Sequence, residues 1–223
     1  MRVGAAVEED EAMIKTVAAS AIFMLLFGAG LMSQAGFGAE ATLSDPAAKQ
    51  IQSFYATLLD TMRRGPQLGI EGRYKALEPA VEASFDLPEM TRLTVGPTWT
   101  SMSESDRQKV IAAFRRMTVA NYAANFNEYN GQQFVVDPMV VDRNGEKIVR
   151  SRMIPADGKA PIPFVYRMHQ SGNGWKAIDV YLNGVISELA TRRSDFSSTL
   201  QSGGATALTE KVNALADSLM KRK

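Results

Sequence analysis

The 223-residue chain contains no cysteine and a single histidine, His169. Without cysteine, neither disulfide bonds nor thiolate metal sites can form. A zinc site needs three or four ligands, and there is no second histidine to help supply them. A Ser-His-Asp triad would have to use His169, yet the chain has no Gly-x-Ser-x-Gly motif. We therefore interpret His169 as a structural residue and predict neither a metal nor a cofactor.

Other signs of catalysis or nucleic-acid binding are also scarce. The chain has no glycine-rich phosphate-binding loop, and its formal net charge of +1 does not favour nucleic-acid binding. Asp179 lies among apolar residues, so we expect it to be partly buried in a structural ion pair. An enzyme stays open as an alternative, with Asp179 and His169 as its pair of ionisable groups.

Charge is missing altogether between Lys15 and Glu40. This stretch follows a basic residue, carries an apolar run at 17–32 and leads into a small-residue Ala-x-Ala site. The order is typical of a secretory leader, so we predict a signal peptide at 1–41, with Met13 as an alternative start. About 20 apolar residues can also span a bilayer, so an uncleaved anchor is the alternative.

The predicted export places the working protein outside the cytoplasm, without access to ATP or reduced nicotinamides. Removing 1–41 takes away two basic and five acidic residues, which leaves a mildly basic chain. Residues 42–223 are enough for one hydrophobic core, and we predict a single domain there.

Helical periodicity dominates the first half of this domain. The predicted helices run from the Asp45 cap to Gly65, from Arg73 to Phe85 with Pro79 kinking or dividing the helix, over Pro88–Leu93, and from the Ser103 cap to Gly131. Aspartate or serine before each helix, proline at the start and glycine at the end are typical boundary residues.

The period then changes to that of strands. Four strand-like runs follow, at Gln133–Val141, Lys147–Ile154, Ile162–Gln170 and Trp175–Leu182. Asn144-Gly145 and Asn173-Gly174 predict hairpin turns, and helical periodicity returns after Gly184, with a break at Gly203-Gly204. The sequence thus predicts an α+β fold: a four-stranded antiparallel curved sheet packed with several helices around an apolar cavity.

We expect the cavity to be lined by apolar side chains from the long helix, the sheet and the segment after it. These are Phe114, Tyr122, Phe126, Phe164, Tyr166, Val180, Leu182, Val185, Ile186 and Leu189. Methionines elsewhere in the domain suit adaptable packing against flexible chains. Ordinary core packing would produce the same periodicity, and that alternative stays open.

Two blocks of the sequence have an order and spacing that are fairly specific. The first is Phe85–Trp99 (FDLPEMTRLTVGPTW) with Ser103, Arg107, Gln108, Phe114 and Tyr122 after it. The second comprises Tyr166 and the runs at 174–180 (GWKAIDV), 183–187 (NGVIS) and 193–196 (RSDF). Together these blocks resemble the MlaC family, also called the toluene-tolerance family, and the likeness extends from about Asp45 to Leu219. Where the family usually reads Gly-Val-Ser, this chain has Ile186 inserted, and Asp195 replaces the usual Gln. That variant looks like the hopanoid-associated HpnM branch.

The resemblance implies a lipid-binding protein of the periplasm of Gram-negative bacteria, working with an ABC transporter in outer-membrane lipid asymmetry. Its partners would be a phospholipid or hopanoid cargo and, transiently, lipid transport complexes of the inner and outer membranes. Such a shuttle performs no reaction. The alternatives are an enzyme of hopanoid lipid modification and an adaptor that docks membrane complexes without carrying lipid.

Overall fold

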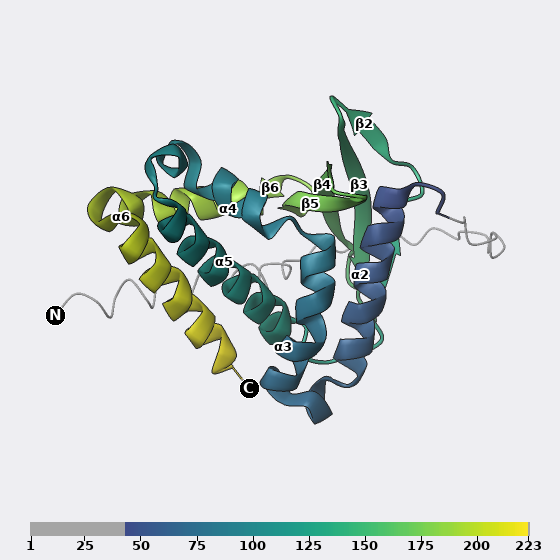
Figure 1. Cartoon of the computed structure of the whole chain (residues 1–223). Coiled ribbons are helices and arrows are strands. Elements are labelled where there is room, and N and C mark those ends of the chain that lie inside the picture. The colour runs from purple at the N-terminus through teal and green to yellow at the C-terminus, as the bar shows by residue number, and fades with distance from the viewer. Residues whose placement is uncertain (1–42, 223) are drawn as a thin grey trace, which may run out of the picture. The chain divides into compact units, whose positions relative to one another are not determined.

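A computed structural model of the polypeptide describes residues 43–222. The predicted signal peptide, and with it the anchor alternative, lies outside the described residues. In chain order the elements are α2 (Pro46–Arg63), α3 (Gly65–Ser84), α4 (Leu87–Val95), the 3₁₀ helix η1 (Gly96–Ser101), α5 (Glu104–Asn125), β1 (Gln133–Val136), β2 (Val141–Arg143), β3 (Glu146–Ile154), β4 (Ile162–Ser171), β5 (Gly174–Leu182), β6 (Ile186–Ser187) and α6 (Glu188–Met220). Figure 1 shows this α+β arrangement, as predicted.

Helix α2 begins where the sequence predicts. The Asp45 carboxylate accepts a 2.8 Å hydrogen bond from the Ala47 amide, and Pro46 occupies the first helical position. The carboxylate also pairs with Lys147 of β3. Although burial acts against it, these contacts hold the pKa of Asp45 below its usual value. The helix start is thereby tied to the sheet.

Helix α3 is longer than predicted. It begins at Gly65 instead of Arg73, and its break lies at Gly69, which has a φ of 60°, while Pro79 is inside the helix. A Cβ atom at Gly65 would lie 1.8 Å from the Asn127 carbonyl oxygen. That glycine is therefore required by close packing against the Asn127 backbone.

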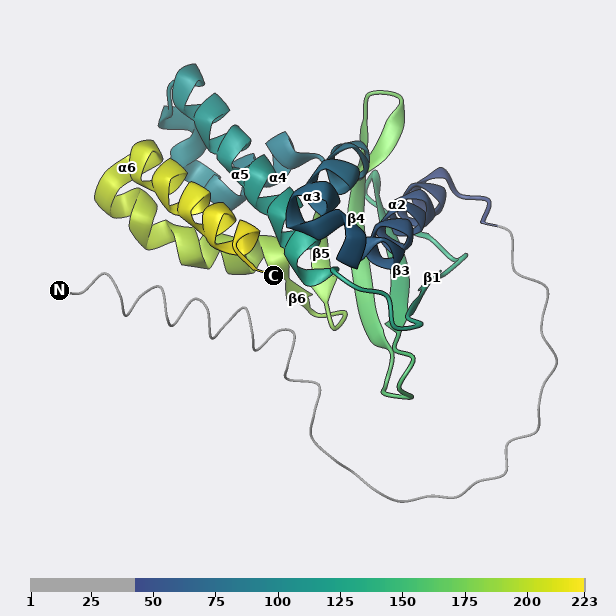
Figure 2. The ribbon, with the colours of Figure 1, turned by 90° about the horizontal axis from the view of Figure 1, so that it is seen from below.

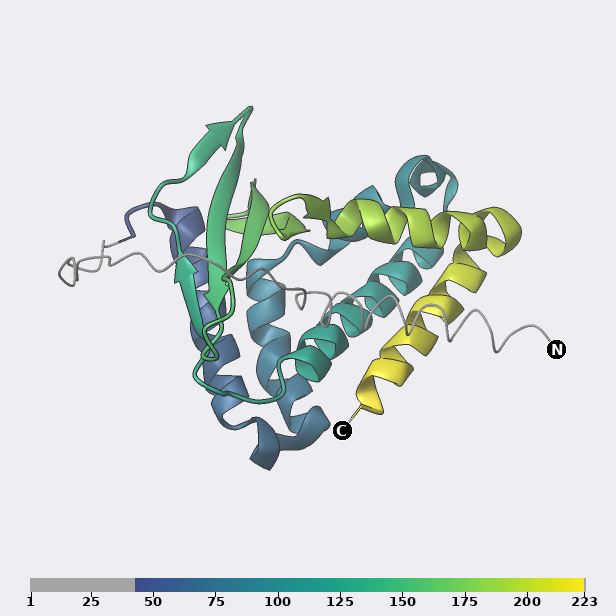
Figure 3. The same cartoon turned by 180° about the vertical axis from the view of Figure 1, so that it is seen from behind.

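The two long helices that follow are capped by serines. Ser103 accepts a 3.1 Å hydrogen bond from the Asp106 amide at the start of α5, as predicted. The helix ends at Asn125, before the predicted Gly131. Gly204, with a φ of 62°, bends α6 into two arms, which confirms the predicted break. Figures 1 and 3 show the second arm running beside α5.

The sheet has six strands instead of the predicted four, all antiparallel, in the order β1-β3-β4-β5-β6 with β2 also on β3. The first predicted strand is split into β1 and β2. Between them, the Met139 amide donates a 2.9 Å hydrogen bond to the Asp137 carboxylate, and Pro138 has no amide hydrogen to donate to a ladder. The two-residue β6 adds a short edge to β5.

Both hairpin turns contain asparagine and glycine, but only one has the predicted position. Asn144 and Gly145 both have positive φ values, 54° and 83°, as a type I′ turn requires. In the second hairpin, Ser171 pairs with Gly174, so the turn is Gly172-Asn173. It lies one residue before the predicted dipeptide because Gly172, with a φ of 60°, takes the position that needs a glycine.

The sheet has an inner face, which meets α2 and α3, and an outer face. Figure 2 shows this helix pair beside the sheet, with α4, α5 and α6 toward the β5–β6 edge. At the junction of α3 and α4, the Asp86 amide donates a 2.9 Å hydrogen bond to the Ala177 carbonyl of β5. The hydrophobic core lies between the inner face and the helices.

Candidate functional site

Strand register places the inner-face side chains in rows across the sheet. Val149, Tyr166 and Val180 are aligned on β3, β4 and β5. The next row, one pleat along, consists of Ser151, Phe164, Leu182 and Ile186. Five of the predicted lining residues therefore share one face of the sheet, although their separation in sequence did not require it.

Side chains of the first row are more deeply buried than those of the second. Tyr166 is 2% exposed and Val180 is 7% exposed, whereas Phe164 and Leu182 are only partly buried against the core, and Ile186 is 50% exposed. We call this half-buried apolar region, with Phe126 and Phe134, the open end of the inner face. A continuous apolar surface thus runs from the core to solvent.

Aromatic rings fill the space above the buried row. Phe54 of α2 makes edge contacts with Phe85 and Tyr122, each at 5.1 Å between ring centroids. Phe134 stacks on Tyr55 at 4.5 Å, and Tyr122 stacks on Phe126 at 5.7 Å. The rings form a connected layer between helices and strands.

A small polar network lies inside this layer. The Tyr55 hydroxyl is 2.7 Å from the Ser151 hydroxyl and 2.8 Å from that of Tyr166. Burial raises the pKa of Tyr55 to about 12, against the effect of these hydrogen bonds, and burial also raises the pKa values of Tyr122 and Tyr166. The three phenols are therefore neutral near pH 7 and leave the interior uncharged.

The remaining predicted lining residues occupy different environments. Phe114 is buried within α5, and Leu189 is half-buried at the start of α6. Val185 is 78% exposed, so with Ile186 it lies at the rim and not inside. Tyr55, Phe134 and Ser151 were not predicted to belong to the site. Tyr55 was visible only as part of an apolar stripe, and the contacts of Ser151 depend on strand register.

Asp179 is buried as expected, but its contacts are those of a helix cap and not of an ion pair. Its carboxylate accepts hydrogen bonds from the Ser187 hydroxyl at 2.7 Å and the Leu189 amide at 3.2 Å, at the start of α6. A third, at 2.8 Å, comes from the Val180 amide. A helix N-terminus attracts negative charge, so no cation is needed to stabilise this carboxylate.

His169 has a different acidic partner from the one considered in the enzyme alternative. Its Nε2 atom is 2.9 Å from Asp86, and the Ser171 hydroxyl donates a 2.8 Å hydrogen bond to the same carboxylate oxygen. In a catalytic triad the histidine lies between serine and aspartate. Here the aspartate is central, so this arrangement cannot activate the serine. Asp179 and His169 have separate partners.

Asp86 makes the stability of the fold pH-dependent. Burial acts to raise its pKa, but hydrogen bonds from the Glu89 amide, Ser171 and His169 outweigh burial and lower the pKa below 3.8. A carboxyl with a depressed folded-state pKa stabilises the fold at higher pH, and loses that effect as pH falls through the folded-state value. We expect Asp86→Asn to cost about 1–2 kcal/mol at pH 7.

The matched measurement is urea denaturation at pH 7 and at a pH below the folded-state pKa of Asp86, which itself lies below 3.8. The difference between wild type and Asp86→Asn should disappear at the lower pH. Asp142→Asn, at an exposed position on β2, serves as the control and should change stability little at pH 7. An Asp86→Asn cost that is the same at both pH values would contradict this account.

The structure has surface hollows on the sheet and at the helix ends, and the two described here are not lined by the predicted residues. The outer hollow, about 650 Å³, is on the outer face of the sheet. The second, about 440 Å³, lies where the ends of α5 and α6 meet α3. Aromatic rings fill the space between the helices and the inner face, where the sequence predicts an apolar cavity. The cavity therefore stays a prediction.

Residues 43–222 contain no group of three or more His, Cys, Asp or Glu side chains able to hold a metal ion. Among the helices of the same residues, none is both long and apolar enough to cross a membrane.

The family model described as MlaC protein matches residues 52–214. A phospholipid-binding protein from Ralstonia solanacearum, solved in complex with a phospholipid, is similar in fold, with a TM-score of 0.68 and 21% sequence identity. The match covers 79% of this chain and 100% of the Ralstonia chain.

Proposed function

Since the chain belongs to the MlaC family, we propose that it binds a lipid between the inner face of its sheet and its helices. We further propose that it works in the periplasm as a shuttle between lipid transport complexes of the inner and outer membranes. The Ralstonia protein of the same fold holds a phospholipid, which supports phospholipid as the cargo. A hopanoid, suggested by the HpnM-like spacing at 184–187, is the alternative cargo.

The observation that carries this proposal is the continuous apolar inner face. It begins at the fully buried Tyr166 and Val180 and reaches solvent at the open end. Each methylene removed from water gains about 0.8 kcal/mol, so about ten methylenes contribute about 8 kcal/mol, which corresponds to a micromolar dissociation constant. An uncharged interior suits a hydrocarbon tail, while a headgroup could stay in water at the rim.

Lipid binding requires the aromatic layer to open. Tyr122, Phe126 and Phe134 are packed against the core but only partly buried. Displacing these rings toward solvent would expose the inner face without unfolding the buried row. The lipid tail would then replace the ring contacts that are lost.

The two alternatives predict different behaviour. An enzyme needs ionisable groups that converge on one site. The pair suggested for it does not converge, because His169 contacts Asp86 whereas Asp179 accepts a hydrogen bond from Ser187. An adaptor would have a filled interior and an exposed apolar patch, and it would never carry lipid. The rim residues Val185 and Ile186 are exposed, so lipid content is the measurement that separates adaptor from carrier.

We expect Phe164→Glu to reduce co-purified lipid more than tenfold, because it places a carboxylate at the open end of the inner face. Val165→Glu is the matched control. It changes the next residue of the same strand, also half-buried, but on the outer face. Both proteins are purified from the periplasm of the same host and their lipids are extracted and quantified by mass spectrometry.

The control should retain lipid at the wild-type level, and both variants should show cooperative thermal unfolding. Lipid of the same amount in both variants would contradict the assigned site. Wild-type protein purified from its own periplasm without any lipid would favour the adaptor. Hopanoid in place of phospholipid in that sample would identify the alternative cargo.

A further inference from the structure

The outer hollow has a strongly basic lining. Its lining residues are Val141, Arg143, Asn144, Glu146, Ile148, Arg150, Val165, Arg167, Tyr181 and Gly184. Three arginines thus surround one acidic residue, and Arg152 lies beyond them on the same face, in register with Pro163. The face opposite the helices therefore has an excess of positive charge.

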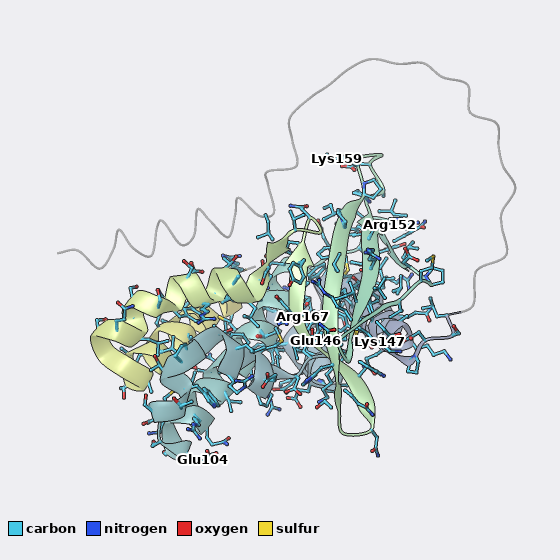
Figure 4. The ribbon with its side chains drawn as sticks, turned by 90° about the horizontal axis from the view of Figure 1, so that it is seen from above. Glu104, Glu146, Lys147, Arg152, Lys159 and Arg167 are labelled. Carbon is cyan, nitrogen blue, oxygen red and sulfur yellow. The ribbon has the colours of Figure 1, made fainter. Side chains whose placement is uncertain are left out.

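Most of this charge is not neutralised by the protein itself. Arg167 lies 3.5 Å from Glu146, yet its Nε atom is buried without a hydrogen-bond partner. Within residues 43–222, no ion pair involves Arg143, Arg150 or Arg152. Figure 4 shows Arg167 and Glu146 close together on the sheet, with Arg152 farther along toward the turn that carries Lys159. Several guanidinium groups are therefore available for an external anion.

An exposed apolar side chain lies among these arginines. Val141, which lines the hollow, is 40% exposed, and Met139, two residues before it in the connection between β1 and β2, is 73% exposed. Arginine and exposed apolar residues together suit the interface of an anionic bilayer, where guanidinium groups bind phosphates and apolar side chains enter the headgroup region. A soluble acidic partner would bind the arginines, but it would leave the exposed apolar side chains in water, whereas a bilayer would bury them in its headgroup region.

From this combination we infer that the outer face of the sheet binds the surface of an anionic phospholipid bilayer. The arginines around the outer hollow contact lipid phosphates, and Met139 and Val141 contact the headgroup region. This surface is on the opposite face of the sheet from the proposed cargo site. The inference is therefore independent of which lipid is carried.

Vesicle flotation tests the inference directly. Protein purified from the periplasm, as for the lipid analysis, is mixed with vesicles of phosphatidylcholine containing about one third phosphatidylglycerol, or of phosphatidylcholine alone. We expect binding only to the anionic vesicles, and a strong decrease between about 0.05 M and 0.5 M salt because screening shortens the range of the attraction. The variant Arg143→Glu/Arg150→Glu should reduce the bound fraction more than tenfold, since it replaces two attractive charges by two repulsive ones.

The matched control is Lys49→Glu/Lys75→Glu, which makes the same change in net charge at exposed positions of α2 and α3. It should bind anionic vesicles like wild type. Phe164→Glu should also bind them normally, which separates this surface from the cargo site. Equal loss in both double variants, binding to neutral vesicles, or no binding to anionic vesicles would overturn the inference, the last also being the result expected for an acidic protein partner.

Discussion

Val180→Asp should cause the largest loss of stability that we expect from a single substitution. The side chain is 7% exposed and lies in the buried row of the inner face with Val149 and Tyr166. Burying an unpaired carboxyl and losing the apolar contacts together should cost about 4 kcal/mol or more, against a total stability of about 5–15 kcal/mol for a typical domain. Urea denaturation of lipid-free protein measures this loss.

Tyr181→Asp is the matched control, because the next residue of the same strand is half-buried on the outer face. It should cost about 1 kcal/mol. Similar stabilities for the two variants would contradict the assignment of inner and outer faces. Although Val180 and Tyr166 are predicted lining residues, their burial makes a charge there a test of stability and not of lipid binding. Phe164, at the open end, is the site for the lipid test.

Asp179→Ala should cost about 3 kcal/mol, the second largest effect we expect. The substitution leaves the Ser187 hydroxyl and two backbone amides without their acceptor, and unpaired buried donors are costly. Urea denaturation again provides the measurement. Asp142→Ala, which removes an exposed carboxylate on β2, should change stability by less than about 0.5 kcal/mol.

Asp179→Asn distinguishes a cap from an ion pair. An amide oxygen can still accept hydrogen bonds from the start of α6, so the asparagine variant should be intermediate between wild type and alanine. In an ion pair, asparagine would be nearly as damaging as alanine because the charge itself would be needed. An asparagine variant no more stable than the alanine variant would therefore contradict the cap.

Local signals in the sequence correctly predicted much of the fold. Asp45 and Ser103 cap the helices they were expected to cap, Asn144-Gly145 forms its hairpin turn, and Gly204 breaks the last helix. Each of these depends on a residue and its near neighbours along the chain. The α+β class follows from their order, which is why it was accessible without a structure.

Features that depend on distant contacts were missed or misplaced. Pro138 split a run that looked like one strand. Asp86 of the α3–α4 junction binds His169 of β4, a pairing across 83 residues that no local pattern indicates. The same limit applies to the site. Phe164 and Tyr166, both predicted as lining residues, share the inner face because they are two residues apart on β4, but only register and burial separate the open end from the buried row.

The most direct test of the central proposal is a crystal structure of the protein purified with its native lipid. We expect the lipid tail to lie against Phe164 and Leu182 on the inner face, with the rings of Tyr122, Phe126 and Phe134 displaced from their present contacts. A lipid-saturated protein whose aromatic layer is packed as described here, with lipid bound elsewhere, would contradict the proposal.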